Sequence, residues 1–203
     1  MKVLAAGDFH DNSEMIERIV EEANSGKYDL FLALGDYYTK EAYTNLMKPI
    51  DIMKLGISGN RDFNFDTPEN EELPFLYNYT KANMEDWKVI ALGAIYPEDF
   101  MKDIKEWLGD HPREKVIFAS HYPPHMLCDL TYSGNHAGIP QFRELIMRNK
   151  PILWLCGHVH EAAGVKSLMK TTVVNAAITE TGKAYSIEIE GEEVNTETVD
   201  LSK

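Results

Sequence analysis

Seven residues of the types that ligate metals follow apolar segments of the chain. They are Asp8 and His10, then Asp36, Asn60 and His121, and finally His158 and His160. Imidazole is the commonest protein ligand for transition metals, and oxygen ligands complete many such sites. Each motif alone is weak, because Gly-Asp and Gly-Asn pairs are often simple turns and a single histidine is often a satisfied structural residue. Five motifs, each directly behind an apolar segment, indicate a metal centre assembled from distant parts of the chain.

The elements that would position these residues alternate along the sequence. Strands are predicted over residues 3–6, 30–34, 54–58, 88–92, 116–119 and 152–156. An amphipathic helix with Asn12 or Ser13 as its N-cap should end near Gly26, and further helices are expected over residues 40–47, 99–108 and about 142–149. This alternation favours parallel strands with helices outside. Ligands of such sheets bind at the carboxyl ends of the strands, so the five loops should meet at one edge.

The remaining segments carry weaker signals. Residues 63–74 are polar and contain two prolines, which predicts a surface loop. Pro123 and Pro124 forbid a helix, so a long irregular loop is expected to run to Gly138. Strands predicted over residues 171–175, 184–189 and 194–201 are interpreted as an antiparallel meander that closes the domain.

Composition limits the class of protein. The chain has 203 residues, 44% of them hydrophobic, which suits a single domain over residues 1–203. No apolar run approaches the ~18 residues of a membrane span, and the N-terminus is too quickly acidic for a signal peptide, so a cytoplasmic location and no membrane partner are expected. The net charge of −13 makes a nucleic-acid partner unlikely. Without a Cys-x-x-Cys pair a structural zinc site is not expected, and Cys156 is interpreted as a buried thiol.

The five motifs, in this order, resemble the pattern of the calcineurin-like metallophosphoesterases. The matching segments are Asp8-x-His10, Gly35-Asp36, Gly59-Asn60, the lone His121, and Gly157-His158-x-His160. The resemblance extends over residues 1 to about 175. It implies an α/β fold of two packed mixed β-sheets flanked by helices, a four-layer αββα sandwich with a two-metal centre between the sheet ends.

The resemblance also implies a role for each ligand. Asp8, His10 and His160 would hold the first metal, Asn60, His121 and His158 the second, and Asp36 would bridge both. Mixed nitrogen and oxygen ligands suit Mn²⁺, the preferred choice here, or Fe, Zn, Co or Ni, better than Ca²⁺. Two such cations ~3.5–4 Å apart polarise a phosphate and lower the pKa of a bridging water, whose hydroxide can attack phosphorus in line. The expected function is hydrolysis of a small phosphodiester or phosphomonoester.

One position departs from the family pattern. Arg61 stands where the family has a histidine that stabilises the transition state and protonates the leaving group. A guanidinium can bind phosphate oxygens, but it does not release a proton usefully. Either the leaving group needs no proton, or another acid supplies one. His136 is the candidate acid, with His125 as a weaker one, and Asp62 is expected to orient a ligand side chain rather than to transfer a proton.

Two other functions stay open at this point. Because Arg61 replaces the histidine, a catalytically degenerate, metal-binding scaffold or interaction protein of the same fold remains an alternative. A nuclease is less favoured, because the chain is acidic and has no basic stripe. The sequence does not identify the substrate, and it leaves a homo-oligomer open. Four tyrosines near the motifs, which could line a substrate pocket or pack as core, are Tyr37, Tyr38, Tyr122 and Tyr132.

Overall fold

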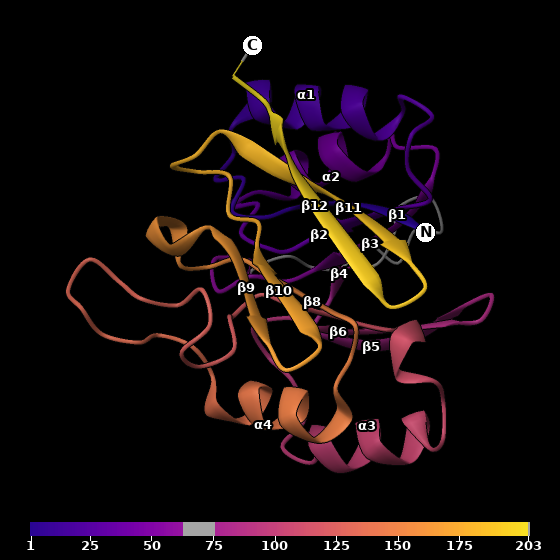
Figure 1. Ribbon diagram of the computed structural model, residues 1–203. Helices are drawn as coiled ribbons and strands as arrows, with labels where there is room; N and C mark the ends of the chain where they lie inside the picture. The colour runs from indigo at the N-terminus through magenta and orange to yellow at the C-terminus, as the bar shows by residue number, and fades with distance from the viewer. Residues whose placement is uncertain (63–75, 203) are drawn as a thin grey trace.

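The computed structural model describes residues 1–62 and 76–202, and it contains two six-stranded mixed sheets packed face to face (Figure 1). The strand order is β12-β11-β1-β2-β3-β4 in the first sheet and β5-β6-β7-β8-β10-β9 in the second. Helices α1 and α2 lie outside the first sheet, and α3 and α4 lie outside the second (Figure 1). The four-layer arrangement of helix, sheet, sheet and helix confirms the expected fold class.

The first sheet is built from both ends of the chain. Its strands are β1 (Lys2–Ala6), β2 (Leu30–Ala33), β3 (Met53–Ile57), β4 (Leu76–Tyr77), β11 (Lys183–Glu190) and β12 (Glu193–Asp200). Strands β1 to β4 are parallel, whereas β11 pairs antiparallel with both β1 and β12. The connecting helices are α1 (Ser13–Ala23) and α2 (Lys40–Met47). The parallel strands therefore send their carboxyl ends to one edge.

The second sheet is built from the middle of the chain. Its strands are β5 (Tyr79–Met84), β6 (Trp87–Leu92), β7 (Val116–Ser120), β8 (Leu153–Cys156), β9 (Gly164–Leu168) and β10 (Thr171–Asn175). Strands β6, β7, β8 and β10 are parallel, and the edge strands β5 and β9 are antiparallel to their neighbours. Helices α3 (Phe100–Leu108) and α4 (Pro140–Asn149) and the short 3₁₀ helices η1 (Arg113–Lys115) and η2 (His160–Ala162) complete this half.

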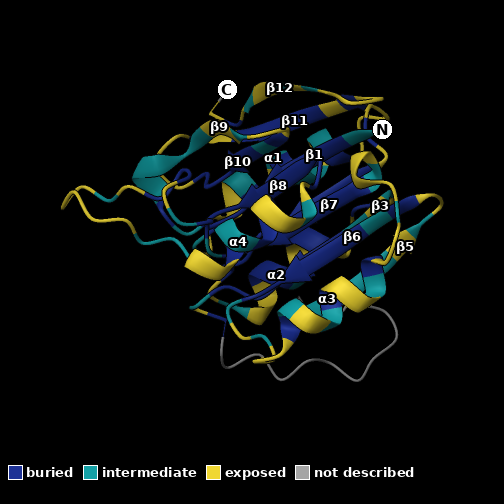
Figure 2. Cartoon of the chain, turned by 60° about the horizontal axis from the view of Figure 1, so that its bottom comes forward, coloured by how far each residue is buried: buried dark blue, intermediate teal, exposed yellow. Residues whose placement is uncertain are grey.

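Apolar side chains fill the three spaces between the four layers. Leu32 from the first sheet and Ile117 and Leu155 from the second belong to the central core. A second cluster joins the first sheet to α1 and α2, and a third joins the second sheet to α3 and α4. The strands are mostly buried while the helices carry their exposed residues outward (Figure 2). Strands buried on both faces require continuous apolar runs, which is why their sequences show no alternation.

Local signals fixed several elements correctly. The Asn12 side chain caps α1 by accepting from the Met15 backbone N–H at 3.1 Å, so Asn12 rather than Ser13 is the N-cap. Helix α2 has the predicted bounds. Cys156 is buried, as expected, and Cys128 is buried as well, both as free thiols. No helix among the described residues is long and apolar enough to cross a membrane.

The predicted C-terminal meander is wrong. Strand β10 pairs parallel with β8 in the second sheet, whereas β11 and β12 form a hairpin in the first. Val173 and Val174 are fully buried and pack in two different cores, which explains why β10 belongs inside a sheet. Strands β4, β5 and β9 were not predicted from the sequence. All three are edge strands, and neither β5 nor β9 contains a buried residue. The loop predicted over residues 63–74 lies outside the described residues.

Candidate metal centre

Loops from both sheets are hydrogen-bonded to one another at the carboxyl ends of their strands. The Asp8 N–H donates to the Gly35 carbonyl at 2.9 Å within the first sheet, and the Gly157 N–H donates to the His121 carbonyl at 3.0 Å within the second. His121 joins the two sheets, because its Nδ1 lies 2.9 Å from the Leu34 carbonyl oxygen. The five predicted loops therefore do meet at one place.

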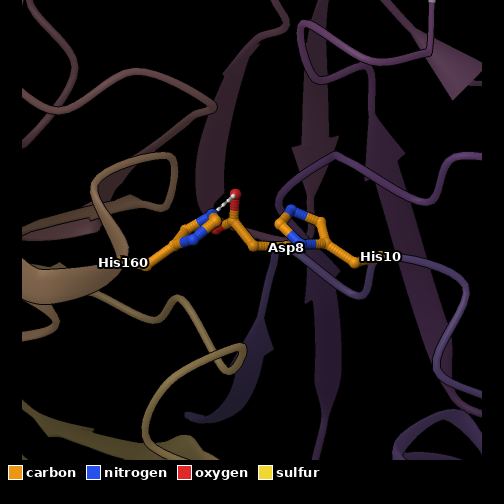
Figure 3. A group of neighbouring side chains, drawn as sticks. All are labelled: Asp8, His10 and His160. Carbon is orange, nitrogen blue, oxygen red and sulfur yellow. Dashed lines mark hydrogen bonds and ion pairs between the residues drawn. The ribbon is translucent and has the colours of Figure 1, made fainter.

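Asp8 lies between two histidines that are far apart in the chain (Figure 3). Its Oδ1 is 3.3 Å from His160 Nε2, and the rings of His10 and His160 are 4.7 Å apart. Side chains of Asp8, His10 and His160 each offer a ligand atom, and these atoms all lie within 4.8 Å of one another. Three donors this close can hold one cation.

Asp36 belongs to a second group that shares Asp8 with the first. Ligand atoms of Asp8, Asp36 and His121 also lie within 4.8 Å of one another. Asp36 turns one oxygen to each side, with Oδ1 3.7 Å from His121 Nε2 and Oδ2 3.8 Å from His10 Nε2. A carboxylate in this position can contact two cations at once.

Asn60 and His158 complete the neighbourhood. Asn60 Oδ1 lies 2.8 Å from His121 Nε2, and the His158 ring lies 5.1 Å from the His121 ring. The His158 backbone N–H donates to Asp8 Oδ2 at 2.9 Å. The structure thus brings together all seven residues that the sequence analysis singled out.

Two imidazole nitrogens are consistent with a bound cation. His10 Nε2 is buried, yet it has no hydrogen-bond partner among the described residues. A buried polar atom without a partner is costly, and a metal ion would satisfy it. His121 Nδ1 is committed to the Leu34 carbonyl, so the proton sits there and the Nε2 lone pair is left for a metal. The residues present therefore fit a divalent cation.

The protonation of the site favours ligation at Asp36 and His158 and opposes it at His160. Burial raises the pKa of Asp36, but interactions with His10 and His121 and the Arg61 backbone N–H outweigh it and hold that pKa below its ordinary value. Burial lowers the pKa of His158 to about 4, so this ring is neutral at pH 7. The hydrogen bond to Asp8 raises the pKa of His160 above its ordinary value. Metals bind only the deprotonated forms of these groups.

The backbone of the site is held in an uncommon conformation. Asp8, His10, Asp36 and His158 have φ values of 61°, 47°, 56° and 71°, in the left-handed region that residues other than glycine rarely adopt. Such strain persists where surrounding contacts impose it, and it concentrates at functional sites.

The buried Asp62 carboxylate supplies part of that constraint. It accepts backbone N–H bonds from Asp36 at 2.8 Å, Tyr37 at 2.9 Å and Gly59 at 2.7 Å. Asp62 therefore ties the loop after β2 to the loop after β3. This placement agrees with an orienting role better than with proton transfer.

Glycines make room for the carboxylates. A Cβ on Gly59 would lie 2.1 Å from Asp36 Oδ1, and a Cβ on Gly157 would lie 2.4 Å from Asp8 Oδ2. Both distances are far below van der Waals contact. These two positions accept no side chain while the carboxylates stay where they are.

The predicted catalytic residues outside the ligand set are placed differently. Arg61 follows Asn60, donates its backbone N–H to Asp36 Oδ1 at 2.9 Å, and is exposed. His136 lies in the connection between β7 and α4, where its Nδ1 is 2.7 Å from Asp129 Oδ1. His125 lies beside the same carboxylate, with its Nδ1 3.7 Å from Asp129 Oδ2. The contacts of the described residues do not join either histidine directly to the seven.

Two of the four tyrosines pack on the ligand histidines. Tyr38 stacks on His10 with ring centroids 4.5 Å apart, and Tyr122 meets His158 edge-on at 4.6 Å. Tyr37 is fully buried and belongs to the core. Tyr132 is 81% exposed, and its hydroxyl donates to Glu180 Oε2 at 2.6 Å.

The sequence analysis missed three residues that support the site. Thr179 Oγ1 donates to the Asp8 carbonyl at 2.6 Å, and the Asn175 side chain donates to the Val159 carbonyl, between two predicted ligands, at 2.8 Å. The third is Asp129, the partner of His136. Asn175, at the end of β10, followed the same strand-end rule and could have been found. Thr179 and Asp129 carry no such signal.

Comparisons with known proteins identify one family and several structures of similar fold. Residues 1–162 match the family model described as calcineurin-like phosphoesterase. The chain is similar to a dimetal phosphatase from Danio rerio, with a TM-score of 0.69, 11% identity, and coverage of 100% of this chain and 99% of that one. It is also similar to a purple acid phosphatase from yellow lupin seeds, with a TM-score of 0.66, 12% identity, and coverage of 100% and 52%.

A third similar structure has a lower TM-score than these two. It is Vacuolar Protein Sorting 29 from Cryptosporidium parvum, with a TM-score of 0.54, 14% identity, and coverage of 100% of this chain and 98% of that one. Identities this low establish the shared fold and nothing finer. A search of curated proteins found no significant match.

Proposed function

The chain belongs to the calcineurin-like phosphoesterase family, and from this premise we propose that it hydrolyses a small phosphodiester or activated phosphomonoester. One observation supports this most directly. Asp36 lies between two groups of metal-type side chains, with one oxygen toward His121 and the other toward His10. A pair of adjacent cations is the arrangement that phosphoester cleavage uses.

We assign the ligands to two positions. Asp8, His10 and His160 hold one cation, Asn60, His121 and His158 hold the other, and Asp36 contacts both. Mixed nitrogen and oxygen donors favour Mn²⁺, with Fe, Zn, Co or Ni as substitutes. When bound, the cations supply positive charge beside the phosphate oxygens and lower the pKa of water. The rest of the chain orients these ligands. The Leu34 carbonyl accepts from the His121 ring, and Asp62 holds the loops after β2 and β3 together.

Arg61 takes the phosphate-binding role in this proposal. It follows the ligand Asn60, and its backbone is fixed on Asp36, so its exposed side chain starts at the edge of the centre. A guanidinium presents a planar set of donors that matches phosphate oxygens. It cannot donate a proton to the leaving group, and we assign that role to His136 for substrates that need it.

A metal titration with a matched pair of variants tests the proposal. Metal-free protein supplied with Mn²⁺ should hydrolyse bis(p-nitrophenyl) phosphate. Asp36→Asn should lower that rate about 100-fold or more, since the cations contribute several kcal/mol and each 1.4 kcal/mol is tenfold. Glu17→Gln, an exposed position on α1, should leave it unchanged. An unaltered rate of hydrolysis in Asp36→Asn would contradict the mechanism.

A metal-binding scaffold without turnover is the second candidate. Arg61 in place of the family histidine favours it, and so does the similarity to Vacuolar Protein Sorting 29. Calorimetry that shows Mn²⁺ binding, together with no turnover of a phosphoester panel, would support the scaffold. Activity gained by Arg61→His would identify a degenerate enzyme. Salt-sensitive binding to single-stranded DNA would instead support a nuclease.

A further inference from the structure

We infer that Asp129 is a positioning residue that presents His136 as the acid for leaving groups that require a proton. The inference rests on the proposed function, and it adds a residue that the ligand motifs do not include. Residues 125–138 connect β7 to α4 and are called the β7–α4 hairpin below; they project from the body of the molecule (Figure 1).

The Asp129 carboxylate is completely buried, and both of its oxygens accept hydrogen bonds. Its Oδ2 accepts the backbone N–H of Met126 at 2.9 Å and that of Gly138 at 3.0 Å, which closes the base of the hairpin. Its Oδ1 receives His136 Nδ1 at 2.7 Å. Burial raises the pKa of Asp129, but these hydrogen bonds outweigh it and keep the pKa below its ordinary value. Asp129 is therefore an anion that faces an imidazole.

This pairing fixes which nitrogen of His136 is free. An ionised carboxylate only accepts, so Nδ1 must carry the proton that points at Asp129. Nε2 is then the nitrogen that exchanges protons with its surroundings, and the side chain is 33% exposed. An Asp–His pair of this kind holds the ring in one tautomer and one orientation.

The hairpin is attached to the ligand loops at several points. It follows His121 directly, and the Asn175 side chain bridges it to the ligand loop by donating to both Cys128 O at 3.1 Å and Val159 O at 2.8 Å. Further out, Tyr132 donates its backbone N–H to Glu161 and its hydroxyl to Glu180. Glu161 is the neighbour of His160. These contacts attach the hairpin that carries the Asp129–His136 pair to the segment that contains Val159 and His160.

The proton balance of the step is simple. Water supplies the oxygen of the new bond to phosphorus, and the ester bond to phosphorus breaks. The leaving oxygen keeps the electron pair and takes the proton from Nε2 of protonated His136. The proton released by the attacking water returns to His136 through solvent.

Asp129 and His125 are charged or titratable groups that face His136. The ring centroids of His125 and His136 lie 5.3 Å apart, and Arg143 donates to the His125 carbonyl at 3.2 Å.

Asp129→Asn separates the bonds of this carboxylate to the hairpin backbone from its bond to His136. The amide oxygen can replace Oδ2 toward Met126 and Gly138, while the amide N–H₂ replaces Oδ1 toward His136. The bond to His136 then reverses, and the proton moves to Nε2. Nitrogen-15 NMR of the His136 ring should report this tautomer change, and an unchanged tautomer would show that Asp129 does not position the ring.

The kinetic test compares two leaving groups. With Mn²⁺, Asp129→Asn should lower kcat for diphenyl phosphate about 100-fold or more, because a positioned general acid contributes 10²–10⁴-fold. The rate with bis(p-nitrophenyl) phosphate, whose leaving group departs as an anion, should stay near that of the wild type. His136→Gln leaves the backbone bonds of Asp129 in place and should give the same pattern, even if Asp129→Asn folds poorly. Asp110→Asn, an exposed carboxylate, is the matched control.

The outcomes distinguish the inference from the proposed function. Equal losses with both substrates in His136→Gln would overturn the inference while leaving the metal-dependent esterase intact. Wild-type protein that cleaves neither ester with any of the candidate metals would overturn the proposed function itself. A loss confined to diphenyl phosphate in both variants supports the assignment of Asp129.

Discussion

The four histidines proposed as metal ligands differ in their surroundings. His121 is oriented by the Leu34 carbonyl, and His158 is kept neutral by burial, with a pKa of about 4. His160 is instead bonded to Asp8, which raises its pKa, so a cation must compete with a proton there. His10 Nε2 is buried without a hydrogen-bond partner among the described residues. Each ring thus responds differently to pH and to loss of metal.

The metal-free protein should lose stability on acidification through His158. The ordinary pKa of 6.5 applies to the unfolded chain, and burial lowers the folded value to about 4. Between these values the unfolded state binds a proton that the folded state excludes, so the free energy of unfolding falls as pH drops. His158→Gln removes this contribution. Urea denaturation in EDTA at pH 6.5 and near pH 4 should show a smaller fall in the variant than in the wild type; equal falls would contradict the prediction.

The backbone around the proposed ligands allows little adjustment. It is left-handed at four of these positions, and a Cβ at Gly59 or Gly157 would overlap the Asp36 or Asp8 carboxylate. Asp62 links two of these loops through buried hydrogen bonds. A site built this way depends on backbone position as much as on ligand identity.

Gly157→Ala should weaken metal binding without strain in its own backbone. Its Cβ would lie 2.4 Å from Asp8 Oδ2, so the carboxylate must move, and we expect affinity for Mn²⁺ to fall about 10-fold or more, as for other changes around a metal site. Gly26→Ala is the control: its φ of 78° makes the substitution strained, at about 1 kcal/mol, but no atom beyond its chain neighbours lies within 4 Å. Calorimetric titration should separate the two. Wild-type affinity in Gly157→Ala would show that Asp8 has freedom the structure does not reveal.

Sequence patterns were sufficient for the elements with strong periodicity and for the convergence of the seven residues. Strand-end positions are predictable because parallel strands share an edge, so Asp8 could be placed near Asp36, and His121 near His158, before any coordinates. The meeting of the two sheet ends was implied by the family resemblance. The sheet membership of β10 was not predictable, since apolar runs do not reveal which of two sheets they join. Nor was the Asp129–His136 pair, because it depends on how an irregular hairpin closes.

At the scale of the whole molecule, the centre joins the two sheets. The first sheet supplies Asp8, His10, Asp36 and Asn60, and the second supplies His121, His158 and His160. The acidic surface that follows from a net charge of −13 disfavours long polyanions and suits a small substrate. Cations bound here would link the first sheet to the second.

Mn²⁺ should therefore stabilise the folded protein strongly. A ligand present at 100 times its dissociation constant adds about 2.7 kcal/mol when it binds only the folded state. Thermal unfolding with Mn²⁺ and with EDTA should show a higher midpoint with metal, and Asp36→Asn should remove most of that difference. Identical midpoints in the wild type would count against a centre between the sheets.

The pairing of β1 with β11 has a consequence for synthesis of the chain. Strand β1 leaves the ribosome well before one of its two neighbours, β11, which spans Lys183–Glu190. The first sheet cannot be completed until β11 has been translated, and β1 has an unpaired edge until then. An exposed edge strand invites pairing with other chains, so we expect the nascent polypeptide to depend on chaperones that shield its N-terminal segment.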